Sequence, residues 1–277
     1  MTASAAHRAT GRPRPLIVVP ARFSESASAL RYRAEVAARA LVEMVYEAGG
    51  EPLILHPSAP DGVVSDGDVA ARIGFADGVL LPGGGDLAGR WSEEVDHETL
   101  YDVDVEQDAF DLALARVAVR SHRPVLAACR GTQVLTVADG GRLVPDMVEA
   151  SGSPDGHHRH RRHEVRVAEG SRLAASVGSS LTASCYHHQC IAPAGSTDTL
   201  GAGRLGIGAG QTESLGAGRL GIGRLVPTAW AEDGTIEAIE APEHTGWLLG
   251  VQWHPEDTVA ADPAQQALLQ AFISACR

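Results

Sequence analysis

Two segments far apart in the chain carry the residue types of a covalent hydrolase. In residues 124–135, PVLAACRGTQVL, an apolar run ends at Cys129 and a glycine-containing turn begins. In residues 250–256, GVQWHPE, His254 follows a second apolar run and Glu256 lies two residues further on. A cysteine nucleophile needs a base beside it and a carboxylate that orients the base. We therefore expect Cys129, His254 and Glu256 to form one catalytic site.

The residues around Cys129 predict a sharp strand-to-helix turn. Ala127 and Gly131 flank the cysteine, and small side chains at these two positions avoid a clash that larger ones would cause. A helix that begins at Gly131 would direct its positive end at the sulfur and favour the nucleophilic thiolate. Backbone N–H groups at such a turn can bind a developing oxyanion. A lone cysteine at a strand end is more often a small buried hydrophobic residue. The presence of His254 as a base is what favours a catalytic role for Cys129.

Strand-like and helix-like segments alternate through the first half of the chain. Apolar, β-branched runs predict strands at 15–21, 51–57, 76–84 and 123–129. Helical spacing of apolar residues predicts helices at 28–50, 104–123 and 131–141. Buried strands that alternate with helices imply a parallel sheet covered on both faces, with ligands bound beyond the carboxyl ends of the strands. The expected fold class is therefore α/β, with three α/β/α layers and a mostly parallel central sheet.

The second half of the chain is less regular. Residues 157–163, HHRHRRH, predict a basic, imidazole-rich loop before a strand at 163–168. The stretch LGAGRLGIG occurs twice and predicts a duplicated glycine-rich loop over 200–223. Its glycine spacing resembles a dinucleotide motif, but the strand, helix and downstream acid that such a site needs are missing. Strand-like runs at 224–233, 234–241 and 246–256 and a helix at 263–277 follow, so we expect one domain over 15–277 after a disordered tail at 1–14.

Composition limits the classes of partner. The formal net charge of −12 argues against nucleic acid, because phosphate binding needs a basic face. No apolar stretch approaches the roughly 18 residues of a membrane span, and the basic start lacks the apolar core of a signal peptide, so we expect a cytoplasmic protein that does not bind membranes. Four unevenly placed cysteines predict free thiols. We expect a small-molecule substrate, and the sequence leaves a homo-oligomer open.

Four blocks together resemble the class I glutamine amidotransferase-like family. Within it, they are most similar to the gamma-glutamyl hydrolases of peptidase family C26, in particular those that act on gamma-glutamyl-gamma-aminobutyrate. The blocks are LLPGGGDL (80–87), PVLAACRGTQVLTVADGGRLVPD (124–146), YHHQCIAP (186–193) and GVQWHPE (250–256), and they occur in the family's order. The resemblance implies a flavodoxin-like fold and cleavage of a small gamma-glutamyl-amine to glutamate and amine through a thioester, with no cofactor and no metal.

The resemblance also implies a role for each residue of the site. The catalytic triad would consist of Cys129 as nucleophile, His254 as general base and acid, and Glu256 as the residue that orients His254. The oxyanion hole would consist of backbone N–H groups of Gly84 or Gly85 and of Arg130, whose side chain would be solvated or would meet a substrate carboxylate. Residues that bind substrate or brace the catalytic loop would be Gln133, His187, His188 and Gln189. Asp86 would be structural.

The sequence departs from the family pattern at positions that bear on specificity. Ala127 replaces the usual glycine, and Ser184-Cys185 replaces the usual Asn-Ser before the histidine pair. Residues 88–95 lack the proline and tyrosine commonly found there. The leaving amine is therefore not assigned by the resemblance.

Three other functions fit parts of the pattern. A glutaminase subunit would deliver ammonia to a separate synthase, and a catalytically inactive binding protein would keep the fold alone. A zinc-binding protein would use histidines and cysteines; the candidates are His157, His158, His160, His163, Cys185, His187, His188 and Cys190. Arginines interleaved with the first four histidines would repel a cation, so we expect the hydrolase.

Overall fold

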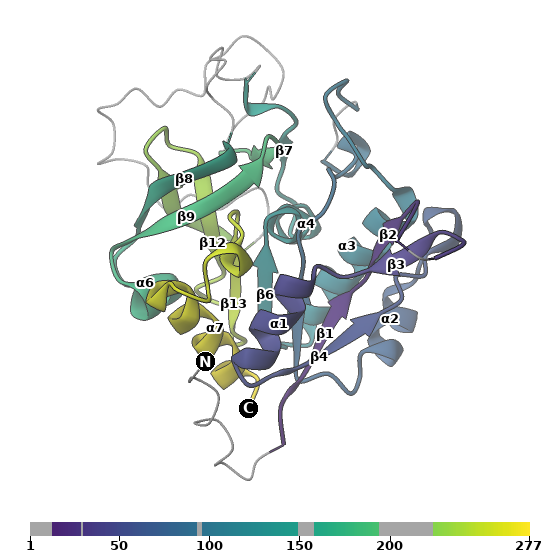
Figure 1. The fold of residues 1–277 in the computed structure, drawn as a ribbon, viewed down its shortest axis with the longest axis horizontal. Coiled ribbons are helices and arrows are strands. Elements are labelled where there is room, and N and C mark those ends of the chain that lie inside the picture. Colours follow the sequence, from purple (N-terminus) through teal and green to yellow (C-terminus); the bar gives the residue numbers. More distant parts are fainter. Residues whose placement is uncertain (1–12, 29, 93–95, 149–157, 194–223) are drawn as a thin grey trace.

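A nine-stranded sheet forms the centre of the molecule (Figure 1). The computed structural model describes residues 13–28, 30–92, 96–148, 158–193 and 224–277. Residues 1–12 of the predicted disordered tail at 1–14 and the duplicated loop at 200–223 lie outside the described residues, while Arg14 donates hydrogen bonds to Tyr46 O and Gly50 O. The strand order of the sheet is β4-β1-β5-β6-β13-β12-β11-β8-β9.

Five neighbouring strands of this sheet are parallel and form its first half. They are β4 (Glu51–Leu55), β1 (Leu16–Pro20), β5 (Gly78–Leu81), β6 (Val125–Ala128) and β13 (Leu248–Val251). β6 lies between β5 and β13, with Ala127 opposite both Leu81 and Gly250. The three strands therefore end side by side, and the turns that follow them converge.

The second half of the sheet is antiparallel. It consists of β12 (Ile236–Glu240), β11 (Val226–Ala231), β8 (His158–Val167) and β9 (Ser180–His187). Two small sheets accompany it: β2 (Arg22–Ser24) pairs with β3 (Ala34–Val36), and β7 (Leu143–Val144) pairs with β10 (Cys190–Ile191). β9 is an edge strand, so one side of its backbone is free to meet the loops that follow the parallel strands.

Helices cover both faces of the sheet, as the alternation of buried strand residues requires. Ile17, Leu80 and Leu126 pack against α1 (Arg39–Glu47), α6 (Arg172–Val177) and α7 (Pro263–Ala275), which lie together in Figure 1. Val18 and Val79 point the other way, toward α2 (Asp66–Arg72), α3 (Val105–Arg120) and α4 (Arg130–Ala138). Short 3₁₀ turns lie at Pro60–Gly62, Gly89–Ser92 and Pro255–Asp257. The three-layer α/β/α class is confirmed.

Several predicted elements differ in extent from the observed ones. The helix predicted at 28–50 is confined to α1, because β3 occupies part of that range. The loop predicted at 157–163 is wrong, since residues from His158 onward belong to the long strand β8. The predicted buried strand at 51–57 is an edge strand with partly exposed residues. Among the described residues no helix is long and apolar enough to cross a membrane, and all four cysteines are free and buried.

A buried ion pair network joins α4 to α3. The Arg130 guanidinium donates to Asp108 at 2.5 Å and to Asp111 at 2.5 Å, and the Arg130 side chain is only 2% exposed. Arg22 adds a further bond to Asp111 at 2.7 Å. The Arg130 side chain is therefore neither solvated nor directed at a substrate, and the sequence-based expectation for it is wrong. Its charge fixes the start of α4, the helix that follows Cys129.

Removal of this buried cation should destabilise the protein strongly. In Arg130→Met, Asp108 would lose its cation in a dry environment, and we expect the free energy of unfolding to fall by about 3–5 kcal/mol. Arg120→Met is the matched control, since Arg120 pairs with Asp66 at the surface and should cost at most about 1 kcal/mol. Urea unfolding of both variants measures the two losses. Equal, small losses would contradict a structural role for the Arg130 charge.

Candidate active site

The three residues of the predicted triad lie at the carboxyl ends of adjacent parallel strands. Cys129 directly follows β6, and His254 and Glu256 follow β13. The glycine turn at residues 83–85 follows β5, which flanks β6 on its other side. This is the edge of an open α/β sheet where ligands bind.

Cys129 occupies a strained turn between β6 and α4. Its backbone has φ 49° and ψ −113°, a conformation that L-residues avoid. Two hydrogen bonds to Val251 of β13 hold the turn: Cys129 N–H donates to Val251 O at 2.8 Å, and Thr132 Oγ1 donates to the same oxygen at 2.6 Å. The cysteine is buried and its Sγ lies 3.9 Å from Tyr186 O. The thiol is thus presented at the strand end by backbone geometry, as the sequence pattern predicted.

Gly131 permits this turn because no side chain fits at its position. A Cβ there would lie 2.2 Å from Leu81 O, which belongs to the backbone of the neighbouring strand β5. Helices α2, α3, α6 and α7 begin at a Ser or Asp side-chain cap, whereas α4 begins at Cys129 and α1 at Ala38 without one. The start of α4 is therefore positioned by close packing on β5 and by the buried Arg130.

His254 is oriented by Glu256. The His254 Nδ1–H donates to Glu256 Oε1 at 2.8 Å, and the backbone N–H of His254 donates to Ser184 O at 2.8 Å. His254 Nε2 is buried and has no hydrogen-bond partner among the described residues. This arrangement leaves Nε2 as the ring atom that can exchange a proton with a thiol or a substrate.

Cys129 and His254 approach each other beside Gly83. A Cβ at Gly83 would lie 2.9 Å from His254 Cε1 and 3.6 Å from Cys129 Cβ, so the two side chains share the space that this glycine leaves. Burial lowers the pKa of His254, but the charges of Cys129 and Glu256 outweigh it and raise the pKa to about 11. The raised pKa favours a protonated His254 imidazolium at neutral pH.

The glycine turn after β5 approaches the rest of the site closely. A Cβ at Gly84 would lie 2.6 Å from Arg22 Nε, and one at Gly85 would lie 2.4 Å from Asp102 O. The backbone N–H of Arg130 lies in the first turn of α4, directly after Cys129. These positions are compatible with an oxyanion hole, which stays a prediction.

The four residues predicted to bind substrate or brace the loop are buried: Gln133, His187, His188 and Gln189. Gln133 Nε2 donates to Gln189 O at 2.8 Å, and Gln189 exchanges two hydrogen bonds of 3.1 Å with the backbone of Leu87. His188 Nε2 pairs with Asp86 Oδ2 at 2.7 Å, and Asp86 also accepts from Tyr101 N–H. These contacts favour a bracing role for this block on the loop after β5. Direct contact with substrate stays a prediction.

A cavity of about 250 Å³ opens beside the histidine. Its wall includes Arg22, Leu41, Gly83, Gly84, His254 and Glu256. Burial and the charge of Arg130 lower the pKa of Arg22 to about 10, so Arg22 remains a cation at neutral pH. The cavity therefore places His254 beside the guanidinium of Arg22, a cavity residue that the sequence analysis missed.

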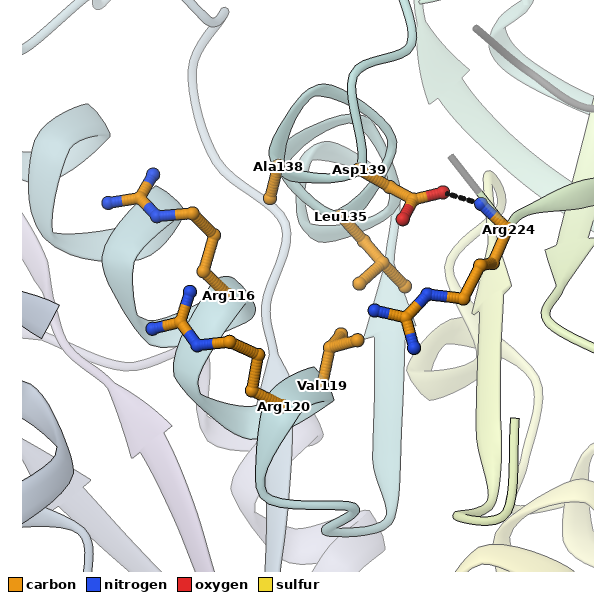
Figure 2. Close-up of a pocket in the computed structure, with 7 residues that line it drawn as sticks. All are labelled: Arg116, Val119, Arg120, Leu135, Ala138, Asp139 and Arg224. Atoms are coloured by element: carbon orange, nitrogen blue, oxygen red, sulfur yellow. Dashed lines mark hydrogen bonds between the residues drawn. The ribbon is translucent and has the colours of Figure 1, made fainter. Parts of the chain in front are cut away.

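A second pocket, of about 160 Å³, lies between α3 and α4 (Figure 2). Arg116 and Arg120 of α3 line one side of it, and Asp139 accepts a hydrogen bond from the Arg224 N–H at 2.6 Å on the other. Its lining contains none of the predicted site residues. The candidate active site is therefore the one at the strand ends and not this pocket.

The histidines and cysteines that were weighed as metal ligands separate into two groups. His158, His163, Cys185 and His187 gather around the buried carboxylate of Glu237. His188 pairs with Asp86, Cys190 packs among apolar residues, the His160 ring lies tilted against Tyr186, and His157 lies outside the described residues. Glu237 was missed by the sequence analysis, because a single glutamate in a strand carries no spacing signal.

Substitution of Gly131 should disturb the turn that presents Cys129. We expect Gly131→Ala to lower the free energy of unfolding by about 1–3 kcal/mol, because the added methyl meets immobile backbone. Gly67→Ala is the matched control, since a Cβ in that helix would meet only Ser65 Oγ at 3.7 Å. Thermal or urea unfolding compares the pair. A Gly131→Ala protein as stable as the Gly67→Ala protein would contradict the close approach.

Comparison with known proteins places this site in a family. The profile of the peptidase C26 family matches residues 15–256. Protein NtpR of Enterococcus hirae is 27% identical over 238 residues, which cover 84% of this chain and 86% of NtpR. The gamma-glutamyl-gamma-aminobutyrate hydrolase of Escherichia coli O157:H7 is 28% identical over 249 residues, covering 84% of this chain and 83% of that protein.

A solved structure agrees with the fold. The glutaminase domain of Trypanosoma brucei CTPS, with bound acivicin, superposes with a TM-score of 0.59 at 16% identity and covers 95% of this chain and 93% of that one. This likeness confirms the expected glutamine amidotransferase-like architecture. Because the family profile spans most of the chain, the protein belongs to the peptidase C26 family of hydrolases.

Proposed function

We propose that the protein hydrolyses the gamma-glutamyl amide bond of a small gamma-glutamyl-amine. The observation that carries the proposal is the strained turn that presents Cys129 beside His254, which in turn is bound to Glu256. Membership in peptidase C26 and similarity to a gamma-glutamyl-gamma-aminobutyrate hydrolase support the reaction type and the substrate class.

In the first half of the proposed reaction, the Cys129 thiolate attacks the gamma-carbonyl carbon of the substrate. The oxyanion would be bound by the backbone N–H groups of Arg130 and of Gly84 or Gly85. The His254 imidazolium then donates its Nε2 proton to the departing amine as the C–N bond breaks. The products of this half are a free amine and a thioester on Cys129.

In the second half, His254 is neutral and accepts a proton from water. The resulting hydroxide attacks the thioester carbonyl, glutamate leaves with its gamma-carboxylate restored, and the Cys129 thiolate and the imidazolium are regenerated. Glu256 stabilises the imidazolium and fixes its tautomer throughout the cycle. Each step uses groups of this chain and water alone.

The cavity beside His254 suits a small, anionic substrate. Its volume of about 250 Å³ is a little below the roughly 300–1,000 Å³ of drug-sized pockets, and Arg22, which pairs with Asp111, contributes a guanidinium to its wall. Leu41 and Pro82 provide apolar surface that could pack on a methylene chain. We therefore propose a gamma-glutamyl-amine with a short aliphatic amine, of which gamma-glutamyl-gamma-aminobutyrate is the first to test.

The alternative within the same chemistry is a glutaminase subunit that passes ammonia to a synthase. The shared fold of this chain and the solved glutaminase domain is the observation that supports this alternative. Ammonia release from free glutamine, measured for this chain alone and beside gamma-glutamyl-amine cleavage, separates the two functions. Efficient cleavage of gamma-glutamyl-amines without a partner supports the hydrolase, whereas activity on glutamine only would favour the glutaminase.

Loss of the thiol should abolish the reaction. We expect Cys129→Ala to reduce kcat for gamma-glutamyl amide hydrolysis by at least about 10³-fold, because no other group can form the thioester. Cys190→Ser is the control, since that thiol packs among apolar residues in a separate cluster and should retain activity. A panel of gamma-glutamyl amides assayed with all three proteins gives the comparison. Unchanged hydrolysis by Cys129→Ala would overturn the proposal.

The pH dependence of kcat/KM should show the effect of the Glu256 carboxylate on His254. His254 must be protonated to supply the leaving amine, so kcat/KM should fall as the pH rises through its raised pKa of about 11. Glu256→Gln removes a negative charge that raises this pKa, so the alkaline limb should move to lower pH.

The neighbouring acid provides the control for that shift. Asp257 is exposed and accepts a hydrogen bond from Ser184 Oγ at 2.8 Å, so Asp257→Asn should leave the limb in place. An alkaline limb that stays unmoved in Glu256→Gln would show that the carboxylate does not act on His254.

A further inference from the structure

A buried cluster of metal-ligand groups lies beside the active site, on three strands of the antiparallel half-sheet. His158 belongs to β8, Cys185 and His187 to β9, and Glu237 to β12; β8 and β9 run side by side in Figure 1. Each residue offers one ligand atom, and the four atoms all lie within 4.8 Å of one another. All four residues are buried, with Glu237 at 0% exposure. Burial of these polar and charged groups costs folding free energy unless they form hydrogen bonds or ion pairs or bind a metal.

The two histidines have the orientation of metal ligands. His158 places Nδ1 toward the cluster and directs Nε2 at Asp233 Oδ2, 3.0 Å away. His187 donates its Nδ1–H to Gln189 O at 3.2 Å, which leaves Nε2 buried with no hydrogen-bond partner among the described residues. Metal-bound histidines usually donate their second ring N–H to a carboxylate or a carbonyl in this way. The unpartnered Nε2 of His187 faces the Glu237 carboxylate at 3.6 Å.

The distances from Cys185 and His187 to the Glu237 carboxylate are those between neighbouring ligands of a tetrahedral ion. Bonds of about 2.0–2.3 Å from zinc to nitrogen, oxygen and sulfur place neighbouring ligand atoms about 3.3–3.8 Å apart. Cys185 Sγ lies 3.6 Å from Glu237 Oε2, and His187 Nε2 lies 3.6 Å from Glu237 Oε1. His158 Nδ1 is closer, at 2.7 Å from Glu237 Oε1, and would have to move by less than about 1 Å.

We propose that His158, Cys185, His187 and Glu237 bind one zinc ion. Two imidazoles, a thiolate and a carboxylate are a donor set for zinc, whereas calcium and magnesium prefer oxygen alone. His163 lies next to the site, with Nε2 at 3.6 Å from Cys185 Sγ, and would be its nearest outer neighbour. The ion would be structural, since every step of the proposed hydrolysis proceeds without it.

The site would stabilise the strand that contacts the catalytic pair. The side chains of Cys185 and His187 enter the cluster, while the carbonyls of the alternate residues face the active site. Ser184 O accepts from the His254 N–H at 2.8 Å, and Tyr186 O lies 3.9 Å from Cys129 Sγ. An ion bound to β9 would therefore fix the backbone that borders both Cys129 and His254.

Metal analysis of the untagged, full-length chain tests the site directly. The protein is stripped with chelator, dialysed against zinc and assayed for bound metal, and a second sample is loaded with Co²⁺ for absorption spectroscopy. We expect one zinc per chain, a thiolate-to-cobalt charge-transfer band, and thermal unfolding that zinc shifts to higher temperature. Cys185→Ser, which installs the residue usual in the family pattern, should lose the band and weaken zinc binding at least about tenfold.

Cys190→Ser provides the matched control and should keep the band and the stoichiometry, because Cys190 packs with Val144, Met147 and Ala192. His187→Gln supplies a second variant that should also lose zinc while keeping a thiol. Binding well below one ion per chain would overturn the proposal. So would a cobalt band that survives in Cys185→Ser, because the thiolate would then come from another cysteine.

Discussion

The left-handed backbone of Cys129 is the constraint on which the active site depends. A non-glycine residue in such a sparsely populated conformation costs about 1–3 kcal/mol, and contacts of the turn with three neighbouring elements offset this cost. Val251 O accepts two hydrogen bonds from the turn, Gly131 lets α4 touch the backbone of β5, and Arg130 ties the helix to α3. These contacts join the turn to the sheet and to the helix layer of α3 and α4, so the position of the thiol depends on the packing of the core.

The register of the parallel strands brings Cys129, His254 and Glu256 together. β6 lies between β5 and β13, so residues separated by more than a hundred positions meet where these strands end. The backbone of the edge strand β9 also borders these residues, and two of its side chains point into the histidine-rich cluster around Glu237. The β9 carbonyls that face His254 and Cys129 belong to Ser184 and Tyr186, whereas the β9 side chains in the cluster belong to Cys185 and His187.

Much of this arrangement could be predicted from the sequence, and the failures have physical causes. The small residues around Cys129 and the order of the strands predicted the turn and the sheet edge. The helix at 28–50 was over-extended because β3 is largely exposed and its residues carry no strand alternation. The run 157–163 suggested a loop because the arginines of β8 are exposed. Within residues 158–163 only His158 is buried, so no alternation of apolar and polar residues marks the strand. One feature of the sequence could have indicated a buried Arg130. Asp108 and Asp111 have the i, i+3 spacing that places two carboxylates on one face of α3.

Covalent capture of the substrate tests the central claim most directly. The enzyme is mixed with a gamma-glutamyl amide, quenched in acid during turnover, and examined by intact-protein and peptide mass spectrometry. The account predicts a transient glutamyl adduct confined to the peptide that contains Cys129, and its absence from Cys129→Ala. An adduct on another residue, or turnover by Cys129→Ala, would contradict the account.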